Sequence, residues 1–324
     1  MKILTVDVGS TYTKLTAIDS DTRSILGTAQ AFTTIETDVM QGFENALCEL
    51  TQNNESNPCA DFSFDKLLVC SSAAGGLKMV ALGLVPDLTA KAARTAASNA
   101  GAKVVKTYAY EISASEQQEI YDINPDLVLL CGGTNGGNKE VIIANAKRLV
   151  AINRPFTTIV AGNKSASDEI AEIFKQSNKN FVITENVMPE FNKLNIEPAR
   201  DAIRNVFIAR IIGAKGLNKI QAMACAEIIP TPLAVLKACE LLSKGTNKNS
   251  GKGDLLAIDI GGATTDVYSM ASGTPTIDNT MTKGLPEPWS KRTVEGDLGM
   301  RYSLQHVYEQ IPGANNPDNE FMSK

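Results

Sequence analysis

The sequence predicts an α/β protein, and two observations carry that prediction. Between residues 77 and 187, apolar runs such as 126–131 and 157–161 alternate with helix-like runs. This alternation is typical of strands buried on both faces of a parallel sheet. The second observation is a strand that ends in Asp and turns on glycine, which occurs twice, at 3–19 and at 255–270. We therefore expect a parallel α/β unit inserted into a protein that builds one acidic hairpin twice.

Each element is expected from its periodicity and its bounding turn residues. In 38–52, for example, Val39, Phe43 and Leu47 share one helical face and Asp38 can cap the helix. We expect strands at 2–8, 12–18, 24–32, within 66–76, at 103–109, 126–131, 157–161, 180–184, in the hairpin 255–270 and at 275–282. We expect helices near 38–52, 87–100, 113–122, 137–150, 165–177, 197–217, 231–244 and 294–311.

Composition excludes several classes of function. The chain has 324 residues, of which 43% are apolar, and a net charge of -5. Its Lys and Arg residues are scattered, which is not the footprint of a nucleic-acid-binding protein. No apolar run is long enough to span a membrane, and the chain starts directly with a strand instead of a signal segment. The six cysteines include no C-x-x-C pair, so we expect buried thiols in a cytoplasmic protein.

The two hairpins combine the groups that bind a magnesium-bound polyphosphate. Glycine lets main-chain N–H groups approach an anion closely. A carboxylate at the strand end would repel bare phosphate but suits hydrated Mg²⁺, which uses one or two carboxylates together with the phosphates. Two such hairpins facing each other would clamp a triphosphate from both sides. The alternative interpretation is a pair of structural turns, each with a capping Asp.

The hairpin motifs resemble those of the actin-like ATPase superfamily, which includes actin, sugar kinases and seventy-kilodalton heat-shock chaperones. "VDVGSTYTK" (6–14) is similar to the first phosphate motif and "IDIGGATTD" (258–266) to the second. The helix at 231–244 resembles the connecting helix between them. The resemblance implies ribonuclease-H-like, actin-type ATPase lobes that bind ATP and Mg²⁺.

Carried over residue by residue, the resemblance assigns roles to both motifs. Asp7 would hold Mg²⁺ through water, and Asp259 would orient or deprotonate the attacking water, or a hydroxyl in a kinase. Asp266 would support the metal shell, so Asp7 and Asp259 are the implied catalytic residues and all three are metal residues. The implied nucleotide contacts are Gly9, Ser10, Thr11, Thr13, Lys14, Gly261, Gly262, Ala263, Thr264 and Thr265. Ala263 stands where family members often carry a third glycine.

Longer strings resemble the accessory protein of glutamate mutase (methylaspartate mutase), a family often labelled MutL and unrelated to DNA mismatch repair. They include "DLVLLCGGTNGGNKEVIIANAKRL" (126–149) and "GLPEPWSKRTVEGDLGMRYS" (284–303), and they extend over nearly the whole chain. The resemblance implies an ATP-dependent, chaperone-like reactivating factor for an adenosylcobalamin-dependent mutase. The implied partners are the subunits of that mutase, either glutamate mutase or a related aminomutase.

The same resemblance implies a division into domains. The expected parts are 1–76 (first lobe), 77–187 (inserted α/β domain), 188–252 (helical continuation and connecting helix) and 253–324 (second lobe). No adenosine motif follows Asp259, so we expect the second lobe to be incomplete and ATP hydrolysis to belong to the full-length protein. We expect the inserted domain to dock on the mutase.

Several interpretations stay open at this point. The Gly132–Gly137 turn is either a ligand-free turn or an anion site, and 287–299, which carries the only Trp, is a nucleotide-proximal loop, a partner surface or a simply packed segment. Alternative functions are a small-molecule kinase, an iron–sulfur activator of 2-hydroxyacyl-CoA dehydratases, and a nucleotide-regulated scaffold or filament. The cysteine pattern speaks against the activator. A homodimer is also open.

Overall fold

The structure is a computed structural model, and it describes residues 1–34, 37–52, 63–72, 78–212, 216–262, 264–274, 277, 280, 285, 287–295, 298–300, 304 and 308. The chain divides into two compact units. Unit 1 comprises Met1–Val235 with Pro275–Pro286, and unit 2 comprises Leu236–Thr274 with Glu287–Lys324. Each unit is described by itself. None of the described helices is long and apolar enough to cross a bilayer.

Unit 1 contains a mixed sheet of five strands in the order β10-β4-β1-β2-β3. Its strands are β1 (Lys2–Val8), β2 (Tyr12–Asp19), β3 (Ser24–Phe32), β4 (Lys66–Ser71) and β10 (Ile229–Pro230). The first three form an antiparallel meander, whereas β4 runs parallel to β1. Helix α1 (Val39–Gln52) packs on β2 and β3, and the Asp38 carboxylate accepts a hydrogen bond from the Met40 N–H, as expected for a cap.

The second sheet of unit 1 is parallel throughout, with the order β6-β5-β7-β8-β9. Its strands are β5 (Lys78–Gly83), β6 (Lys103–Ala109), β7 (Leu127–Leu130), β8 (Thr157–Val160) and β9 (Phe181–Ile183). Because the chain moves from β5 to one side and then back across it, this is a doubly wound sheet whose direction of winding reverses between β5 and β7. The predicted α/β class with a parallel sheet is confirmed.

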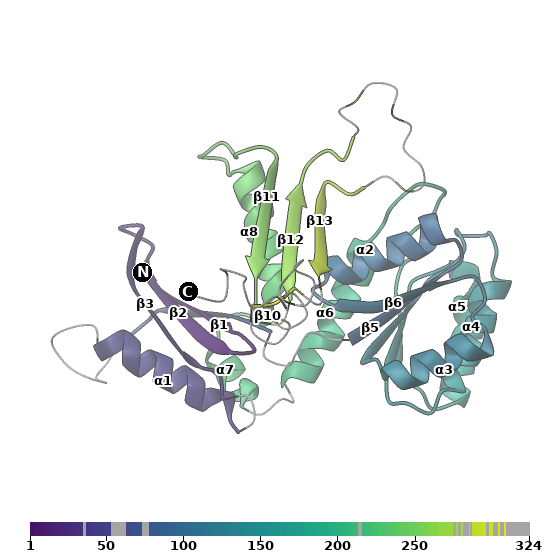
Figure 1. Ribbon diagram of the computed structural model, residues 1–324, viewed down its shortest axis with the longest axis horizontal. Coiled ribbons are helices and arrows are strands. Elements are labelled where there is room, and N and C mark those ends of the chain that lie inside the picture. The colour runs from purple at the N-terminus through teal and green to yellow at the C-terminus, as the bar shows by residue number, and fades with distance from the viewer. Residues whose placement is uncertain are drawn as a thin grey trace, which may run out of the picture. The chain divides into compact units, whose positions relative to one another are not determined.

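Helices link the parallel strands, as Figure 1 shows. They are a π-helical turn η1 (Pro86–Ala90), α2 (Lys91–Asn99), α3 (Ala114–Ile123), α4 (Glu140–Val150), the 3-10 turn η2 (Lys164–Ala166) and α5 (Ser167–Gln176). Then follow α6 (Glu197–Ile212), α7 (Leu217–Met223) and α8 (Thr231–Lys244), which passes from unit 1 into unit 2. Helix α3 begins with a complete capping box between Ser113 and Glu116.

Two apolar clusters fill the two sides of the parallel sheet. One joins the mixed sheet, α2 and α6 through residues such as Leu4, Ala81 and Phe207. The other lies between the opposite side of the parallel sheet and α3, α4 and α5, and it includes Ile120 and Phe174. Since the first cluster is continuous from the N-terminal strands to the parallel sheet, the two sheets of unit 1 share a core.

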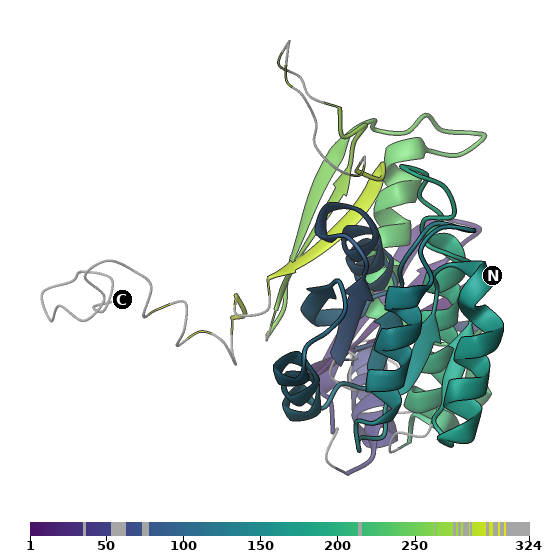
Figure 2. The ribbon, with the colours of Figure 1, turned by 90° about the vertical axis from the view of Figure 1, so that its right-hand side faces the viewer.

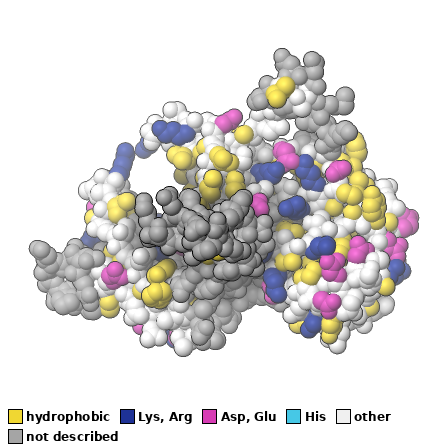
Figure 3. All heavy atoms as spheres, in the orientation of Figure 1, with side chains coloured by type: hydrophobic (Ala, Val, Ile, Leu, Met, Phe, Trp, Pro, Cys, Tyr) yellow, Lys and Arg dark blue, Asp and Glu magenta, His cyan; other side chains and the backbone are white. Residues whose placement is uncertain are grey.

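Unit 2 contains a three-stranded antiparallel sheet in the order β11-β12-β13 (Figure 2). The strands are β11 (Leu255–Ile260), β12 (Thr265–Met270) and β13 (Ser290–Glu295). On β11, Leu256, Ile258 and Ile260 alternate on one face and are exposed, and hydrophobic side chains gather over this region in Figure 3. The β11 row on one face of this sheet is therefore apolar and uncovered in the part of unit 2 that the structure describes.

Most predicted elements are present, but the short elements α7 and β10 were not predicted, and three further differences concern β5, β13 and the last expected helix. The central strand β5 was not predicted, because its short sequence KMVALG carries no alternation. The third strand of unit 2 was expected at 275–282, which lies mostly outside the described residues, and the structure forms it at Ser290–Glu295. That strand also replaces the start of the helix expected near 294–311, most of which lies outside the described residues.

Phe174 tests the second apolar cluster. Its side chain is fully buried and stacks on Phe181 with 5.5 Å between ring centroids. We expect Phe174→Ala to lower the free energy of unfolding by about 3–5 kcal/mol, because it removes apolar contacts and leaves a cavity. Urea denaturation followed by circular dichroism measures this loss. The matched control is Phe191→Ala, whose ring is 71% exposed; a similar loss in both variants would contradict the assignment of the core.

Candidate functional site

The first acidic hairpin joins β1 to β2 through a short turn. Asp7 lies opposite Lys14 in the antiparallel register, and the turn is closed by a hydrogen bond of 3.0 Å from the Gly9 N–H to the Tyr12 carbonyl. A Cβ atom at Gly9 would lie 2.7 Å from that carbonyl oxygen. Because this contact is with main chain, only glycine fits at the turn.

The Asp7 carboxylate is held from one side. Its Oδ1 accepts hydrogen bonds from the Thr231 hydroxyl at 2.7 Å and from the Cys70 thiol at 3.5 Å. Burial, together with the charge of Asp7, raises the pKa of Cys70 to about 12, so the thiol stays protonated and donates. Among the described residues, nothing donates to Oδ2. Asp7 is half-buried, so its carboxylate has Oδ1 fixed by these two donors and Oδ2 without a donor in the described part of the chain.

Other residues of the first hairpin divide between solvent and core. Lys14 is exposed, and Ser10 and Thr11 at the turn are half-buried. Thr13 is fully buried, and its hydroxyl lies 3.0 Å from the Thr33 hydroxyl. The Thr13 side chain therefore faces the interior of unit 1 and supports the hairpin from its buried side.

The second hairpin repeats the geometry of the first. Asp259 lies opposite Asp266, and the Gly261 N–H donates to the Thr264 carbonyl at 2.9 Å. In both hairpins the Asp stands two residues before the glycine whose N–H closes the turn. The expected repetition of one local structure in the two halves of the chain is thus present. Asp259 is exposed, Gly262 is half-buried, and Ala263 lies outside the described residues.

The second hairpin differs from the first in what lies across from its Asp. Asp266 is 7% exposed and forms an ion pair of 2.8 Å with Arg292 on β13, which is 5% exposed. Burial raises the pKa of Asp266, Arg292 opposes that rise and the charge of Asp259 adds to it. Arg292 therefore stabilises the buried Asp266 carboxylate beside Asp259. Arg292 lies in the segment 287–299, whose role the sequence left open, and its pairing with Asp266 was not predicted.

The first hairpin belongs to unit 1 and the second to unit 2. In unit 1 the fold brings Asp7 together with Cys70 and Thr231, neither of which was predicted as a site residue. In unit 2 it brings Asp259, Asp266 and Arg292 together, and the Thr265 hydroxyl donates to the Leu298 carbonyl. The described residues contain no group of three or more His, Cys, Asp and Glu side chains placed to hold a metal by themselves.

The glycine-rich turn Gly132–Gly137 follows β7 at the reversal point of the parallel sheet. Main-chain groups of this turn already form hydrogen bonds with side chains of the protein. The buried Asn163 side chain accepts from the Gly136 N–H at 3.1 Å and donates to the Gly137 carbonyl at 2.9 Å, and Asn186 donates to the Gly133 carbonyl at 2.9 Å. These contacts favour the interpretation of a ligand-free turn fixed by two amides.

The segment around Trp289 is packed within unit 2. The Lys244 ammonium lies 4.3 Å from the centroid of the Trp289 ring, and the Trp289 carbonyl accepts from the Ala271 N–H. Lys291 pairs with Glu287 at 2.8 Å. The tryptophan therefore has a structural environment, which favours the packed alternative among the three considered.

The Asp266–Arg292 pair makes the stability of unit 2 depend on pH when Arg292 is removed. We expect Arg292→Met to cost about 3–5 kcal/mol at pH 7, because it leaves a buried carboxylate without a partner. The folded-state pKa of Asp266 then lies still further above its unfolded-state value. The loss of unfolding free energy in Arg292→Met is therefore complete above the folded-state pKa of Asp266. It shrinks as the pH falls toward the unfolded-state pKa of Asp266. Urea denaturation between pH 4.5 and 8, followed by Trp289 fluorescence, measures both effects.

The control for this prediction is Lys291→Met on the same strand. That ion pair is more exposed, so its loss should cost less than about 1 kcal/mol and should show no comparable change with pH. A deficit in Arg292→Met that stays constant across the pH range would contradict a buried, charged Asp266.

Comparisons with known proteins agree with the resemblance found in the sequence. A protein-family profile described as MutL protein matches residues 3–320. Protein MutL of Clostridium tetanomorphum is 51% identical over 306 residues, which are 94% of this chain and 66% of that protein. The chain thus spans about two thirds of the length of this curated relative.

Two solved structures show weaker similarity. A nucleotide-free acetone carboxylase, from a study of ATP-dependent acetone carboxylation, matches 91% of this chain and 48% of its own, with 15% identity and a TM-score of 0.40. An activator of 2-hydroxyisocaproyl-CoA dehydratase from Clostridium difficile with bound ADPNP matches 65% and 97%, with 10% identity and a TM-score of 0.19. Neither superposition is close enough to carry an argument. On the family profile and the curated relative, the chain belongs to the MutL protein family.

Proposed function

We propose that the two acidic hairpins are the halves of a Mg²⁺-ATP site of the actin-like ATPase type. The observation that supports this most directly is their shared register. In each hairpin an Asp stands two residues before a glycine whose N–H closes the turn by a main-chain hydrogen bond. A purely structural turn has no need of a carboxylate at that position in both copies. The proposal includes ribonuclease-H-like lobes, of which β1–β3 and β11–β13 are the meanders.

The oxygen donors fit magnesium. Asp7 offers Oδ2 while Thr231 and Cys70 fix Oδ1, and Asp259 is exposed beside the second turn. Mg²⁺ needs few protein ligands, because waters and phosphate oxygens complete its shell. When bound, the ion would neutralise charge on the phosphates. Asp266 would act less directly than the sequence suggested, because its carboxylate is already paired with Arg292.

The chain's own groups would then bind and orient. N–H groups of Ser10 and Thr11, and of Gly262 and Ala263, would contact phosphate oxygens. Gly9 and Gly261 would let the phosphates approach the main chain, while their own N–H groups close the two turns. Lys14, exposed opposite Asp7, would add positive charge, and Thr264 and Thr265 would support the second turn. Asp259 would accept a hydrogen bond from the attacking water. Thr13 would contribute through its main chain only.

Family membership supports a role beyond nucleotide binding. We propose that the full-length protein is an ATP-dependent reactivating factor for an adenosylcobalamin-dependent mutase, glutamate mutase or a related aminomutase. Nucleotide that binds two lobe arrangements unequally can shift their populations by that difference in binding free energy, and about 5.5 kcal/mol inverts a 1:99 ratio. The parallel sheet of residues 78–183 would be the part that docks on the mutase. A cytoplasmic location would follow from that partner.

The first test is the effect of the two Asp residues on hydrolysis. In the full-length protein we expect Asp259→Asn to lower ATP turnover by about 10²–10⁴-fold, because the water loses its oriented acceptor. Asp7→Asn should shift the Mg²⁺ dependence to higher concentration. Phosphate release measured across a Mg²⁺ titration reports both changes.

Two further variants make this test specific. Asp254→Asn changes the same charge just before β11, at an exposed position, and should leave turnover unchanged. Thr231→Val removes the donor to Asp7 and should weaken Mg²⁺ binding by about 10–100-fold, whereas Thr231→Ser should not. Equal turnover in Asp259→Asn and Asp254→Asn would exclude the site.

The second test addresses the mutase. Full-length protein, ATP, Mg²⁺ and intact adenosylcobalamin are mixed with an inactivated mutase, and recovery of mutase activity is followed over time. We expect recovery to require ATP and to be lost in Asp7→Asn and Asp259→Asn. Recovery that is equal without ATP would contradict the ATP-driven role. Removal of residues 77–187 should abolish co-purification with the mutase, and persistent co-purification would contradict docking through that part.

A further inference from the structure

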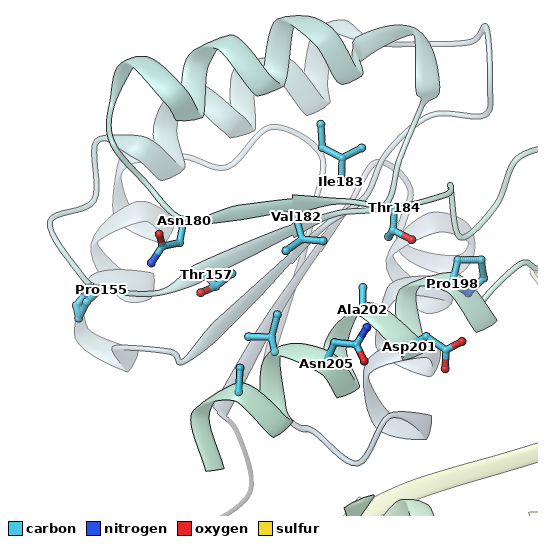
Figure 4. A pocket seen from close by; sticks show the side chains of 12 residues that line it. Pro155, Thr157, Asn180, Val182, Ile183, Thr184, Pro198, Asp201, Ala202 and Asn205 are labelled. Atoms are coloured by element: carbon cyan, nitrogen blue, oxygen red, sulfur yellow. The ribbon is translucent and has the colours of Figure 1, made fainter. Parts of the chain in front are cut away.

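A groove lies beside the open edge of the parallel sheet. It has a volume of about 620 Å³ and lies between β9, the last strand of the sheet, and one face of α6 (Figure 4). Val182, Thr184, Asn180 and Thr157 line the side formed by the sheet. The helix contributes one stripe of mostly small residues: Pro198, Asp201, Ala202, Asn205, Val206 and Ala209.

Along this groove, only every second residue of β9 uses its main-chain N–H and C=O groups to pair with β8. Thr158 donates to the Asn180 carbonyl and Thr184 donates to the Val160 carbonyl, so Asn180, Val182 and Thr184 carry the ladder to β8. In a parallel ladder, every second residue of a strand directs its main-chain N–H and C=O groups away from the neighbouring strand. Phe181 and Ile183 therefore direct their N–H and C=O groups outward. These pairs recur about every 6.6 Å, the repeat of an added strand.

This edge is short, with three residues in β9, but it lacks the charged and proline residues that usually block pairing. Residues 180–184 (NFVIT) contain no Lys and no Pro, and Val182 and Ile183 are 37% and 39% exposed. In Figure 4 the Ile183 side chain points to the face of the sheet opposite Val182, so Ile183 borders the groove through its main chain. Phe181 stacks on Phe174 of α5, which holds the strand in place from that opposite face.

Charge in the groove specifies the occupant further. Asp201 is exposed at the rim, and its carboxylate forms no hydrogen bond or ion pair with the residues that the structure describes. No Lys or Arg lines the groove. A small molecule would leave the outward main-chain pairs of β9 unused. A second copy of β9 is a poor match for Asp201, because residues 180–184 contain no cation and the adjoining Lys179 already donates to the Ile152 and Arg154 carbonyls.

We propose that β9 and this groove bind an extended segment of a partner protein by strand addition. The added strand bonds to Phe181 and Ile183. Its alternate side chains, small and apolar, enter the groove against Val182 and Ala202, and a Lys or Arg side chain pairs with Asp201. This site is independent of the nucleotide proposal, because no residue of either hairpin takes part.

The probe is a library of random octapeptides displayed on phage. It is selected on the full-length protein and counter-selected on Ile183→Pro, which removes an outward N–H without touching the bonds to β8. We expect survivors that alternate small apolar residues and carry Lys or Arg. A synthetic survivor should bind Ile183→Pro at least tenfold more weakly. N-methylation of the peptide should abolish binding at alternate amides only, as measured by fluorescence anisotropy.

Two more variants test the groove itself. Asn205→Arg fills it from an exposed helix position that does not disturb the strand, so it should block binding even if Ile183→Pro folds poorly. Asp201→Asn should weaken binding of Lys-containing survivors about twofold to fivefold, whereas Glu172→Gln, an equal charge change at an exposed site on α5, should not.

Three outcomes would overturn the proposal. One is a selection that yields no peptide family distinguishing the wild-type protein from Ile183→Pro. Another is binding that tolerates N-methylation at every amide, since that binding would not use the main chain of β9. The last is concentration-dependent dimerisation that Asn205→Arg or Ile183→Pro abolishes, because a second copy would then occupy the edge.

Discussion

One main-chain hydrogen bond, made once in each hairpin, positions the candidate site. The bonds from Gly9 to Tyr12 and from Gly261 to Thr264 close the turns and thereby fix the strand register. Register decides which residue stands opposite which, and a slip by one residue would turn each Asp to the other face of its sheet. At Gly9 a side chain is excluded by the carbonyl it would meet. The placement of Asp7 and Asp259 follows from this constraint.

The same local geometry is given two electrostatic environments. Asp7 lies among neutral donors, the Thr231 hydroxyl and a Cys70 thiol whose pKa is raised by burial. Asp259 lies opposite another carboxylate, which Arg292 neutralises. The first arrangement fixes one carboxylate oxygen and leaves the other without a donor among the described residues. The second keeps two carboxylates close, and Arg292 opposes their repulsion. This division suits a site in which one Asp faces a cation and the other faces water.

Helices and neighbouring strands leave part of each unit's sheet surface uncovered among the described residues. The parallel sheet is covered on both faces by helices up to β8, whereas its last strand opens onto the groove beside α6. In unit 2, Leu256, Ile258 and Ile260 are exposed on one face of β11. Exposed apolar rows and open strand edges favour association, because burial of apolar surface and pairing of main-chain groups both stabilise contacts. Each is therefore a surface at which further polypeptide can pack.

Local sequence determined the class of the fold, the meander, most helices and both acidic hairpins, because periodicity, caps and turn glycines act within a few residues. It did not predict β5, a central strand whose residues become a strand only when β6 and β7 pair on either side. It also did not predict the contacts of Thr231 and Cys70 with Asp7 or of Arg292 with Asp266. Those partners come from distant segments or a neighbouring strand, so only tertiary packing, which decides which buried charges and donors meet, could assign them.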